Sequence, residues 1–232
     1  MTQRVAYKMT TKRKHSDSVA GNLLNQKFNP VAADQVWAGD VTYLRTDEGW
    51  MYLAIVMDLY SRRIVSWHID KRMTTELVSS AMIKAYNLRQ SPISLMFHSD
   101  RGSQYISKCY CHLLASYGIR ARMGDVGVCW DNTAVEHFFG SLKHDWLLKV
   151  PQPTREYMRK DVAAYMRCYN LERLHTANGH LSPAEYELSS LKKCPSLVVQ
   201  KIYDSNVLTG QNPKSALPTA IRLVELLQNA GS

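Results

Sequence analysis

Between residues 36 and 69 the chain alternates short apolar runs with polar turn residues. The runs cover 36–44, 50–58 and 64–69, and only a few residues separate one run from the next. Runs of this length that are rich in Val, Ile, Tyr and Trp are typical of β-strands, and short polar links between them are typical of hairpins. This part of the chain is therefore predicted to form three consecutive antiparallel strands.

Farther along the chain, helical periods alternate with shorter β-type runs. Apolar residues recur at helical spacing after Thr74, which is expected to be an N-cap, and Ser182 has the pattern of a second capped helix start. The expected helices cover 74–87, 103–117, 132–148 and 154–171, and the expected strands cover 93–98 and 119–123. A strand that returns parallel needs a helical crossover, so this order predicts an α/β fold with a mixed sheet flanked by helices.

The two ends of the chain depart from this pattern. The first 33 residues carry six basic residues against the single acid Asp17, without a sustained apolar period. We therefore divide the chain into a basic arm at 1–33, a core at 34–187 and a tail of uncertain origin at 188–232. Within the tail, 217–230 has the pattern of an amphipathic helix with no obvious place in the core.

The charge balance points to a polyanionic partner. Lys and Arg number 29 against 20 Asp and Glu, a net charge of +9, which favours nucleic acid or an anionic membrane surface. No apolar run is long enough to span a membrane, and the first 21 residues contain no signal-peptide core, so a cytoplasmic protein is expected, and a nucleoid-associated one if its partner is nucleic acid. The five cysteines are irregularly spaced, and Cys109-Tyr-Cys111-His112 lacks the further ligands of a tetrahedral zinc site.

Three acidic residues lie beside apolar residues of the predicted core elements. Asp40 lies in the first strand, Asp100 follows the fourth strand, and Glu136 opens a helix. Removing an unpaired carboxylate from water is costly, and a hard divalent cation bound by oxygen ligands is one good partner. Taken singly, each acid also has an ordinary local partner, which would be Arg62 for Asp40, Arg101 for Asp100 and a capping box with Thr133 for Glu136.

Taken together, the segments around these acids resemble a known family. Six motifs occur in order: W-x-x-D-x-T-Y at 37–43, G-W-M-Y-L-A at 49–54, D-L-Y-S-R at 58–62, H-S-D-R-G-S-Q-Y at 98–105, D-N-x-x-x-E-x-F-F at 131–139, and Tyr169-Asn170 followed by Arg173 and His175. They resemble the integrase catalytic core, of the DDE type in the retroviral-integrase superfamily, of bacterial insertion-sequence transposases of the two-reading-frame kind. The resemblance covers roughly residues 7–187.

The resemblance implies a fold, a site and a reaction. The fold would be ribonuclease-H-like with a five-stranded sheet. The acidic triad would be Asp40, Asp100 and Glu136, and the thirty-five residues between the last two match the spacing of the superfamily. The triad would be both the catalytic residues and the ligands of two Mg²⁺ ions, which Mn²⁺ replaces, with Asp40 bridging both ions. The reaction would be cleavage of a DNA strand followed by transfer of its 3′-hydroxyl end to target DNA.

The expected partner is DNA, both the element ends and the target, bound by a homodimer or higher oligomer with neither a membrane nor a small-molecule cofactor. Lys143 lies two helical turns after Glu136 and is expected to contact this DNA. The apolar residues of the same helix at 135, 138, 142 and 146 are expected to pack in the core. Further DNA contacts are expected from arginines, namely Arg62, Arg101, Arg167 and Arg173, whereas His98 and Asn132 are expected to support the acids.

The chain departs from the family in three ways. Family members usually carry a helix-turn-helix region before the core, which this chain is expected to lack. Arg122 and Ser66 stand where a serine-like residue and a glycine are expected, and the region from Ser190 onward resembles nothing in the family. Two other functions therefore remain open: a metal-dependent nuclease that does not join DNA, and a catalytically idle DNA-binding remnant of a transposase.

Overall fold

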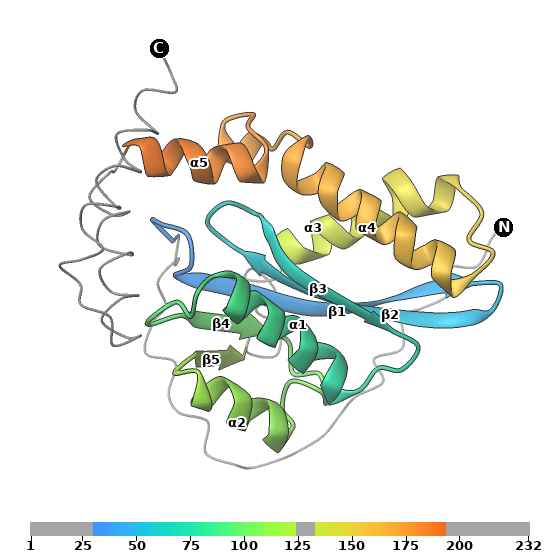
Figure 1. Cartoon of the computed structure of the whole chain (residues 1–232), viewed down its shortest axis with the longest axis horizontal. Coiled ribbons are helices and arrows are strands. Elements are labelled where there is room, and N and C mark those ends of the chain that lie inside the picture. Colours follow the sequence, from blue (N-terminus) through green and yellow to red (C-terminus); the bar gives the residue numbers. More distant parts are fainter. Residues whose placement is uncertain (1–29, 124–132, 194–232) are drawn as a thin grey trace, which may run out of the picture.

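The computed structural model describes residues 30–123 and 133–193, and five strands form a mixed sheet at its centre (Figure 1). The strands are β1 (Val36–Thr46), β2 (Gly49–Asp58), β3 (Ile64–Asp70), β4 (Met96–Ser99) and β5 (Arg120–Met123). Their order across the sheet is β3-β2-β1-β4-β5. The pairs β1–β2 and β2–β3 are antiparallel, whereas β1–β4 and β4–β5 are parallel, so β1 is the strand at which the sheet changes direction.

Helices cover both faces of this sheet. They are α1 (Thr75–Leu88), α2 (Lys108–Ser116), α3 (Thr133–Ser141), α4 (Arg155–Leu171) and α5 (Pro183–Lys193). Apolar residues of α1 and α2 pack on one face around Trp37 and Phe97, and those of α3 and α4 pack on the other face around Leu53 and Ile55. Each large apolar side chain removed from water stabilises the fold by roughly 1.5–3 kcal/mol, so both layers contribute to one domain.

The structure confirms the predicted fold class and the order of the elements. The three hairpin strands, α1 and α4 lie within two residues of their expected bounds. Thr154 caps α4 through a hydrogen bond from the Tyr157 backbone N–H at 3.0 Å. Thr74 is confirmed as the N-cap residue of α1, although its side chain makes no capping hydrogen bond.

Two predicted helices have different bounds. The helix expected at 103–117 begins only at Lys108, because the backbone N–H groups of Tyr105 and Ile106 close a turn onto the Gly102 carbonyl. The α-helix expected at 132–148 ends at Ser141 and continues as one π-helical turn (Leu142–Trp146) and a 3₁₀ turn (Leu147–Lys149). Residue 132 and the segment 217–230 lie outside the described residues.

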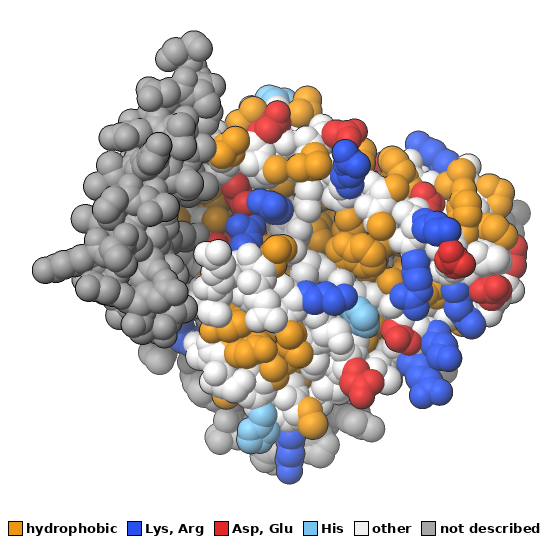
Figure 2. Space-filling model, viewed as in Figure 1, with side chains coloured by type: hydrophobic (Ala, Val, Ile, Leu, Met, Phe, Trp, Pro, Cys, Tyr) orange, Lys and Arg blue, Asp and Glu red, His pale blue; other side chains and the backbone are white. Residues whose placement is uncertain are grey.

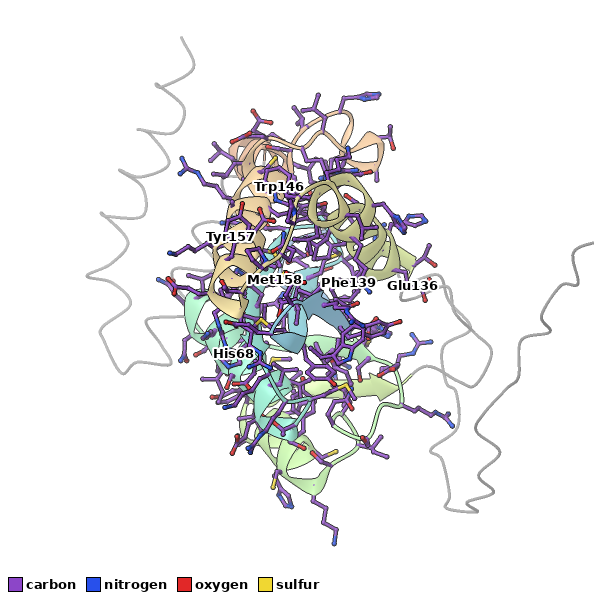
Figure 3. All side chains as sticks on the ribbon, turned by 90° about the vertical axis from the view of Figure 1, so that its right-hand side faces the viewer. His68, Glu136, Phe139, Trp146, Tyr157 and Met158 are labelled. Atoms are coloured by element: carbon purple, nitrogen blue, oxygen red, sulfur yellow. The ribbon has the colours of Figure 1, made fainter. Side chains whose placement is uncertain are left out.

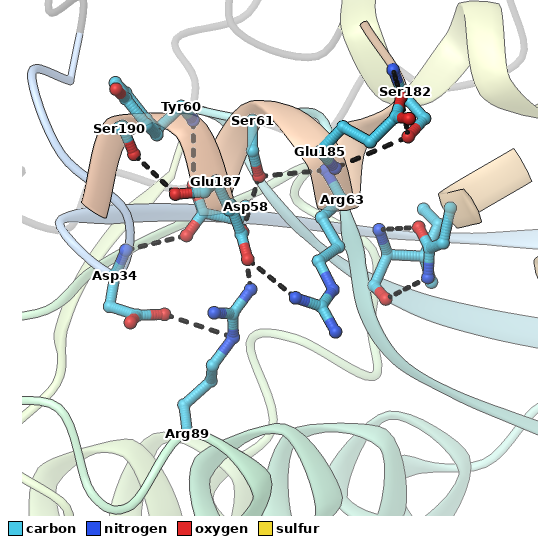
Figure 4. Close-up of polar contacts among 12 residues, drawn as sticks. Asp34, Asp58, Tyr60, Ser61, Arg63, Arg89, Ser182, Glu185, Glu187 and Ser190 are labelled. Carbon is cyan, nitrogen blue, oxygen red and sulfur yellow. Dashed lines mark hydrogen bonds and ion pairs between the residues drawn. The ribbon is translucent and has the colours of Figure 1, made fainter. Parts of the chain in front are cut away.

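Helix α5 is joined to the sheet by a buried ionic network (Figure 4). Glu187 of α5 accepts hydrogen bonds from Arg89 and Arg63, both at 2.7 Å, and from the Ser61 hydroxyl at 2.6 Å. The predicted start of α5 is confirmed, since Ser182 and Glu185 form a capping box. The expected boundary between core and tail at residue 187 therefore falls inside α5, which continues to Lys193.

A groove of about 590 Å³ lies between α1 and α4, beside the edge strand β3. Hydrophobic side chains are visible between these helices in Figure 2. Trp67, Met166 and Leu88 contribute to its lining, whereas none of the three predicted catalytic acids does. None of the helices in residues 30–123 and 133–193 has the length and apolar character needed to cross a membrane.

Candidate active site

The parallel pairing of β1 and β4 sets two of the three predicted acids side by side. Gly39 pairs with Ser99 at the last position of this ladder, so Asp40 and Asp100 are the next residues of the two strands. Backbones of neighbouring strands lie about 4.8 Å apart. Two carboxylates that are sixty residues apart in the sequence therefore start from adjacent positions of the sheet.

A glycine permits this close pairing. A β-carbon placed on Gly39 would lie 2.4 Å from Cζ of Phe97 and 3.2 Å from the backbone oxygen of Ile55. Real β-carbons essentially never come within 3.0 Å of another heavy atom, so a larger residue here would displace the Phe97 ring. The glycine before Asp40 is thus required by the packing between β1 and β4.

Local hydrogen bonds orient the two carboxylates. Oδ1 of Asp100 accepts the backbone N–H of Gly102 at 3.0 Å, which turns the chain sharply after β4. Oδ1 of Asp40 accepts the N–H of Val41 at 2.7 Å. Asp100 is exposed and Asp40 is half-buried, so solvent and a polyanion have access to this edge of the sheet.

A buried phenol lies close to both carboxylates. Tyr105 is only 2% exposed, and its pKa is raised well above the usual value, first by burial, then by Tyr110, and then by the negative charges of Asp40 and Asp100. Tyr105 therefore stays neutral beside the acids. The analysis of the sequence did not single out this residue, although it closes the motif at 98–105.

Glu136 approaches from another element. It lies in the first turn of α3, where the helix dipole favours a negative charge, and it is exposed. In Figure 3 it projects outward from the end of α3, whereas Phe139 of the same helix faces the core. Within residues 30–123 and 133–193, no three His, Cys, Asp or Glu side chains are close enough to hold one metal ion. The structure thus pairs Asp40 with Asp100 but does not join Glu136 to them in a three-ligand cluster.

Lys143 lies near Asp40. Its Nζ lies 4.4 Å from the centre of the Tyr43 ring. Burial lowers the pKa of Lys143, and the negative charge of Asp40 opposes that shift. This ammonium group is therefore a cation beside the first acid, on the π-helical turn after α3.

The predicted arginines lie in three separate places. The pKa of His175 is lowered mainly by burial, and further by the positive charges of Arg173 and of Arg62, which lies in the turn after β2. These two arginines therefore lie around one histidine. Nη2 of Arg173 also lies 3.2 Å from Asp145. Arg101 is exposed directly after Asp100, and Arg167 lines the groove between α1 and α4.

The other predicted residues near the site have structural positions. His98 is buried in β4, where it pairs with Ala38. The apolar stripe of α3 and the following turns is confirmed as core, because these residues pack on the sheet and on α4; they are Val135, Phe138, Leu142 and Trp146. Ser66 is buried, and its hydroxyl donates to the Ala81 carbonyl, which links β3 to α1.

Comparison with known proteins agrees with this architecture. Residues 30–129 and 117–183 match the family described as Integrase core domain. The chain is 43% identical over 180 residues to the transposase InsF of insertion sequence IS3A from Escherichia coli K12, covering 77% of this chain and 62% of InsF. It is 38% identical over 185 residues to an uncharacterized 31 kDa protein of insertion element IS600 from Shigella sonnei, covering 79% of this chain and 68% of that protein.

A solved structure shows the same fold. The HTLV-2 integrase catalytic core domain, in a dimeric form in complex with magnesium, has a TM-score of 0.54 and 19% identity, covering 68% of this chain and 98% of that one. The sheet order and these likenesses define a ribonuclease-H-like integrase core. The chain belongs to the integrase core domain family and is similar to proteins of the insertion sequences IS3 and IS600. It spans about 62% of the length of InsF.

Proposed function

We propose that this chain contains the catalytic core of a DDE-type transposase that cleaves a DNA strand and transfers its end to target DNA. The observation that carries the proposal is the parallel register of β1 and β4, which sets Asp40 beside Asp100 at an accessible edge of the sheet. The family relationship supports it, since the curated relatives include named transposases. The polyanion expected from the net charge of +9 is then DNA.

The carboxylates at this edge have the donor chemistry that suits a divalent metal ion. Carboxylate oxygens are the hard donors that Mg²⁺ prefers, and Mn²⁺ accepts the same ligands. Asp40, Asp100 and Glu136 would hold two ions, and bound metal would stabilise the charge on the attacking and leaving oxygens of an in-line displacement at phosphorus. Glu136 would complete the site from α3, which packs against β1.

The remaining residues of the site would position the substrate. Lys143 lies near Asp40, where its ammonium group would bind a phosphate adjacent to the reacting one. Tyr105 remains a neutral phenol, so it adds no charge to the site while its ring fills the space behind the two acids. Two DNA ends and a target have to meet during transposition, so we also propose a dimer or higher oligomer on DNA.

The test is nicking and joining of labelled plasmid and oligonucleotide DNA by the full chain with Mg²⁺ or Mn²⁺. The variants are Asp40→Asn, Asp100→Asn and Glu136→Gln, each of which removes a charge but nearly keeps the shape. The control is Glu156→Gln, on the exposed surface of α4, where Glu156 forms an ion pair with Lys160.

We expect metal-dependent nicked and joined products from the parent and the control, and a loss of at least 100-fold in each of the three variants. Nicked DNA without joined products would overturn the strand-transfer part of the proposal and identify a nuclease. Folded, DNA-binding parent protein without any product would identify an idle remnant. Equal activity in a triad variant and the parent would exclude that acid from the site.

A further inference from the structure

Two large aromatic side chains are exposed on the hairpin formed by β1 and β2. Tyr43 is 61% exposed and Trp50 is 45% exposed, and neither belongs to the two core clusters. Exposed rings of this size contribute little to the packing of the core. Tyr and Trp are enriched where a protein binds a partner. Two cations lie against these rings, Arg45 from the hairpin itself and Lys143 from the π-helical turn after α3.

The four side chains form a continuous row. Arg45 pairs directly with Trp50 across the hairpin, and its guanidinium carbon lies 5.4 Å from the centre of the Trp50 ring. The Trp50 ring meets the Tyr43 ring edge-on, with centres 5.4 Å apart and planes at 81°. Lys143 then lies over Tyr43 at 4.4 Å. We call this row, Lys143-Tyr43-Trp50-Arg45, the hairpin track.

The track begins at the proposed active site. Lys143 interacts with the charge of Asp40, so one end of the track lies beside the first acid. From there the row follows β1 away from the sheet centre to Arg45. The hairpin tip carries Asp47 and Glu48, but Oε2 of Glu48 accepts the backbone N–H of Arg155 at 2.8 Å and is therefore engaged with α4. The cationic part of the hairpin thus ends at Arg45.

The rings hold the cations in fixed positions. A cation over an aromatic face gains about 0.5–1 kcal/mol at an exposed site, so Lys143 and Arg45 sample fewer rotamers than ordinary surface cations do. A preorganised cation loses less conformational entropy when it binds a phosphate, and a guanidinium group binds phosphate with two parallel hydrogen bonds. The row therefore has the chemistry of a track for a nucleic-acid backbone.

We propose that the hairpin track binds the sugar-phosphate backbone of the DNA strand that extends from the Asp40–Asp100 site. This inference rests on the proposed function and adds Tyr43, Trp50 and Arg45 to it. Five residues of β1 separate Asp40 from Arg45, which is about 17 Å at a rise of about 3.4 Å per residue. Arg45 therefore reaches a phosphate several nucleotides along the strand from the reacting one.

The test measures affinity for duplex DNA without metal over a range of salt concentrations, so that it does not depend on catalysis. Arg45→Gln should weaken binding about tenfold and should lower the slope of log affinity against log salt by about 1, because one phosphate contact is lost. Arg45→Lys should keep the slope. Lys160→Gln, which removes one exposed cation from α4, should bind like the parent.

The rings give a second, charge-neutral test. Trp50→Leu should weaken binding several-fold although every charge remains, and Trp50→Phe, which keeps a ring under Arg45, should bind nearly as the parent does. Melting curves must show that each variant folds. If Trp50→Leu does not fold, the Arg45 variants decide the question.

The outcomes separate this inference from the proposed function. If Arg45→Gln and Trp50→Leu both bind duplex DNA with the affinity of the parent, the track is overturned, even if the parent cleaves and joins DNA. Equal losses in Arg45→Gln and Lys160→Gln would also overturn it, since only net charge would then matter. If the parent never cleaves DNA but the track variants bind duplex DNA more weakly than the parent does, the track is supported while the catalytic proposal fails.

Discussion

The ring of Phe97 lies directly against the α-carbon of Gly39. An added β-carbon would come 2.4 Å from Cζ and 2.9 Å from Cε2 of this ring, which is itself only 1% exposed. The contact joins β1 to β4, one residue before Asp40 and three residues before Asp100. The packing of these two residues is therefore coupled to the position of both carboxylates.

Replacing Gly39 by Ala should destabilise the domain by about 1–3 kcal/mol, because the buried Phe97 ring must move to accommodate the new methyl group. Urea unfolding measures the change. The matched control is Gly140→Ala in α3, where an added β-carbon meets no atom within 4 Å and alanine favours the helix by up to about 1 kcal/mol. If Gly39→Ala unfolds at the same urea concentration as the parent, β1 and β4 have room to separate.

Replacing Glu187 by Gln should destabilise the fold by about 3 kcal/mol. The substitution keeps the shape of the side chain but leaves the largely buried Arg89 without its carboxylate at 2.7 Å. Thermal and urea unfolding measure this loss. Glu156→Gln removes a fully exposed carboxylate from an i,i+4 pair and should leave stability unchanged. Equal stability of both variants would mean that α5 adds little to the core.

The stability of the domain should depend on the protonation of Asp58. Burial raises its pKa to about 6, and the charges of Asp34 and Glu187 act in the same direction, against the hydrogen bond from the Asp34 N–H and the charge of Arg89. The folded state therefore binds a proton more tightly than the unfolded state. This contribution is complete below about pH 4 and is lost as the pH rises through about 6, by up to about 3 kcal/mol.

Comparison with Asp58→Asn isolates this effect, because asparagine does not titrate. The stability difference between the parent and this variant should be largest near pH 4 and should shrink by pH 7. Glu187 contributes with the opposite sign: burial works to raise its pKa, but Arg89 and Ser61 outweigh burial and lower it, so its contribution is lost at acidic pH. A constant difference between the two proteins from pH 4 to pH 7 would contradict the assignment to Asp58.

Replacing Asn170 by Ala should destabilise the domain by about 2 kcal/mol. The Asn170 amide accepts the N–H of Ile64 and donates to its carbonyl, both at 2.9 Å, and so covers part of the unpaired edge of β3. Asn170→Asp keeps the acceptor but places a carboxylate against that carbonyl. Its stability loss should therefore be smaller near pH 4, where the carboxyl group gains a donor proton, than at pH 7. A pH-independent loss would contradict the role assigned to the Asn170 amide as a donor to the Ile64 carbonyl.

Local patterns in the sequence were sufficient for most of the fold. The apolar runs between polar turn residues at 36–69 predicted three strands that the structure confirms, because strands covered by helices on both faces are apolar along most of their length. The stripe from Val135 to Trp146 was likewise predicted to lie in the core. Helix ends were less well predicted. The late start at Lys108 depends on hydrogen bonds to Gly102 that compete with the helix, and these have no periodic signal.

The candidate site was predicted by motifs rather than by composition. The motifs led to Asp40 and Asp100, and the sheet register brings these two together. Tyr105 was missed as a neighbour of the acids, although it belongs to a quoted motif, because a single tyrosine at the end of the polar segment 98–104 carries no signal of its burial. Glu187 was missed because its partners, Arg89 and Ser61, are about a hundred residues away in the chain.

By itself, the sequence determined the family, the element order and the acids at which chemistry is proposed, because periodicity and motif spacing are properties of neighbouring residues. Only the tertiary structure decided which residues lie together across the chain. Pairing of β1 with β4 places Asp40 beside Asp100, and pairing of β1 with β2 places Arg45 over Trp50. Such contacts depend on strand register and on the packing of whole layers, which a local pattern does not encode.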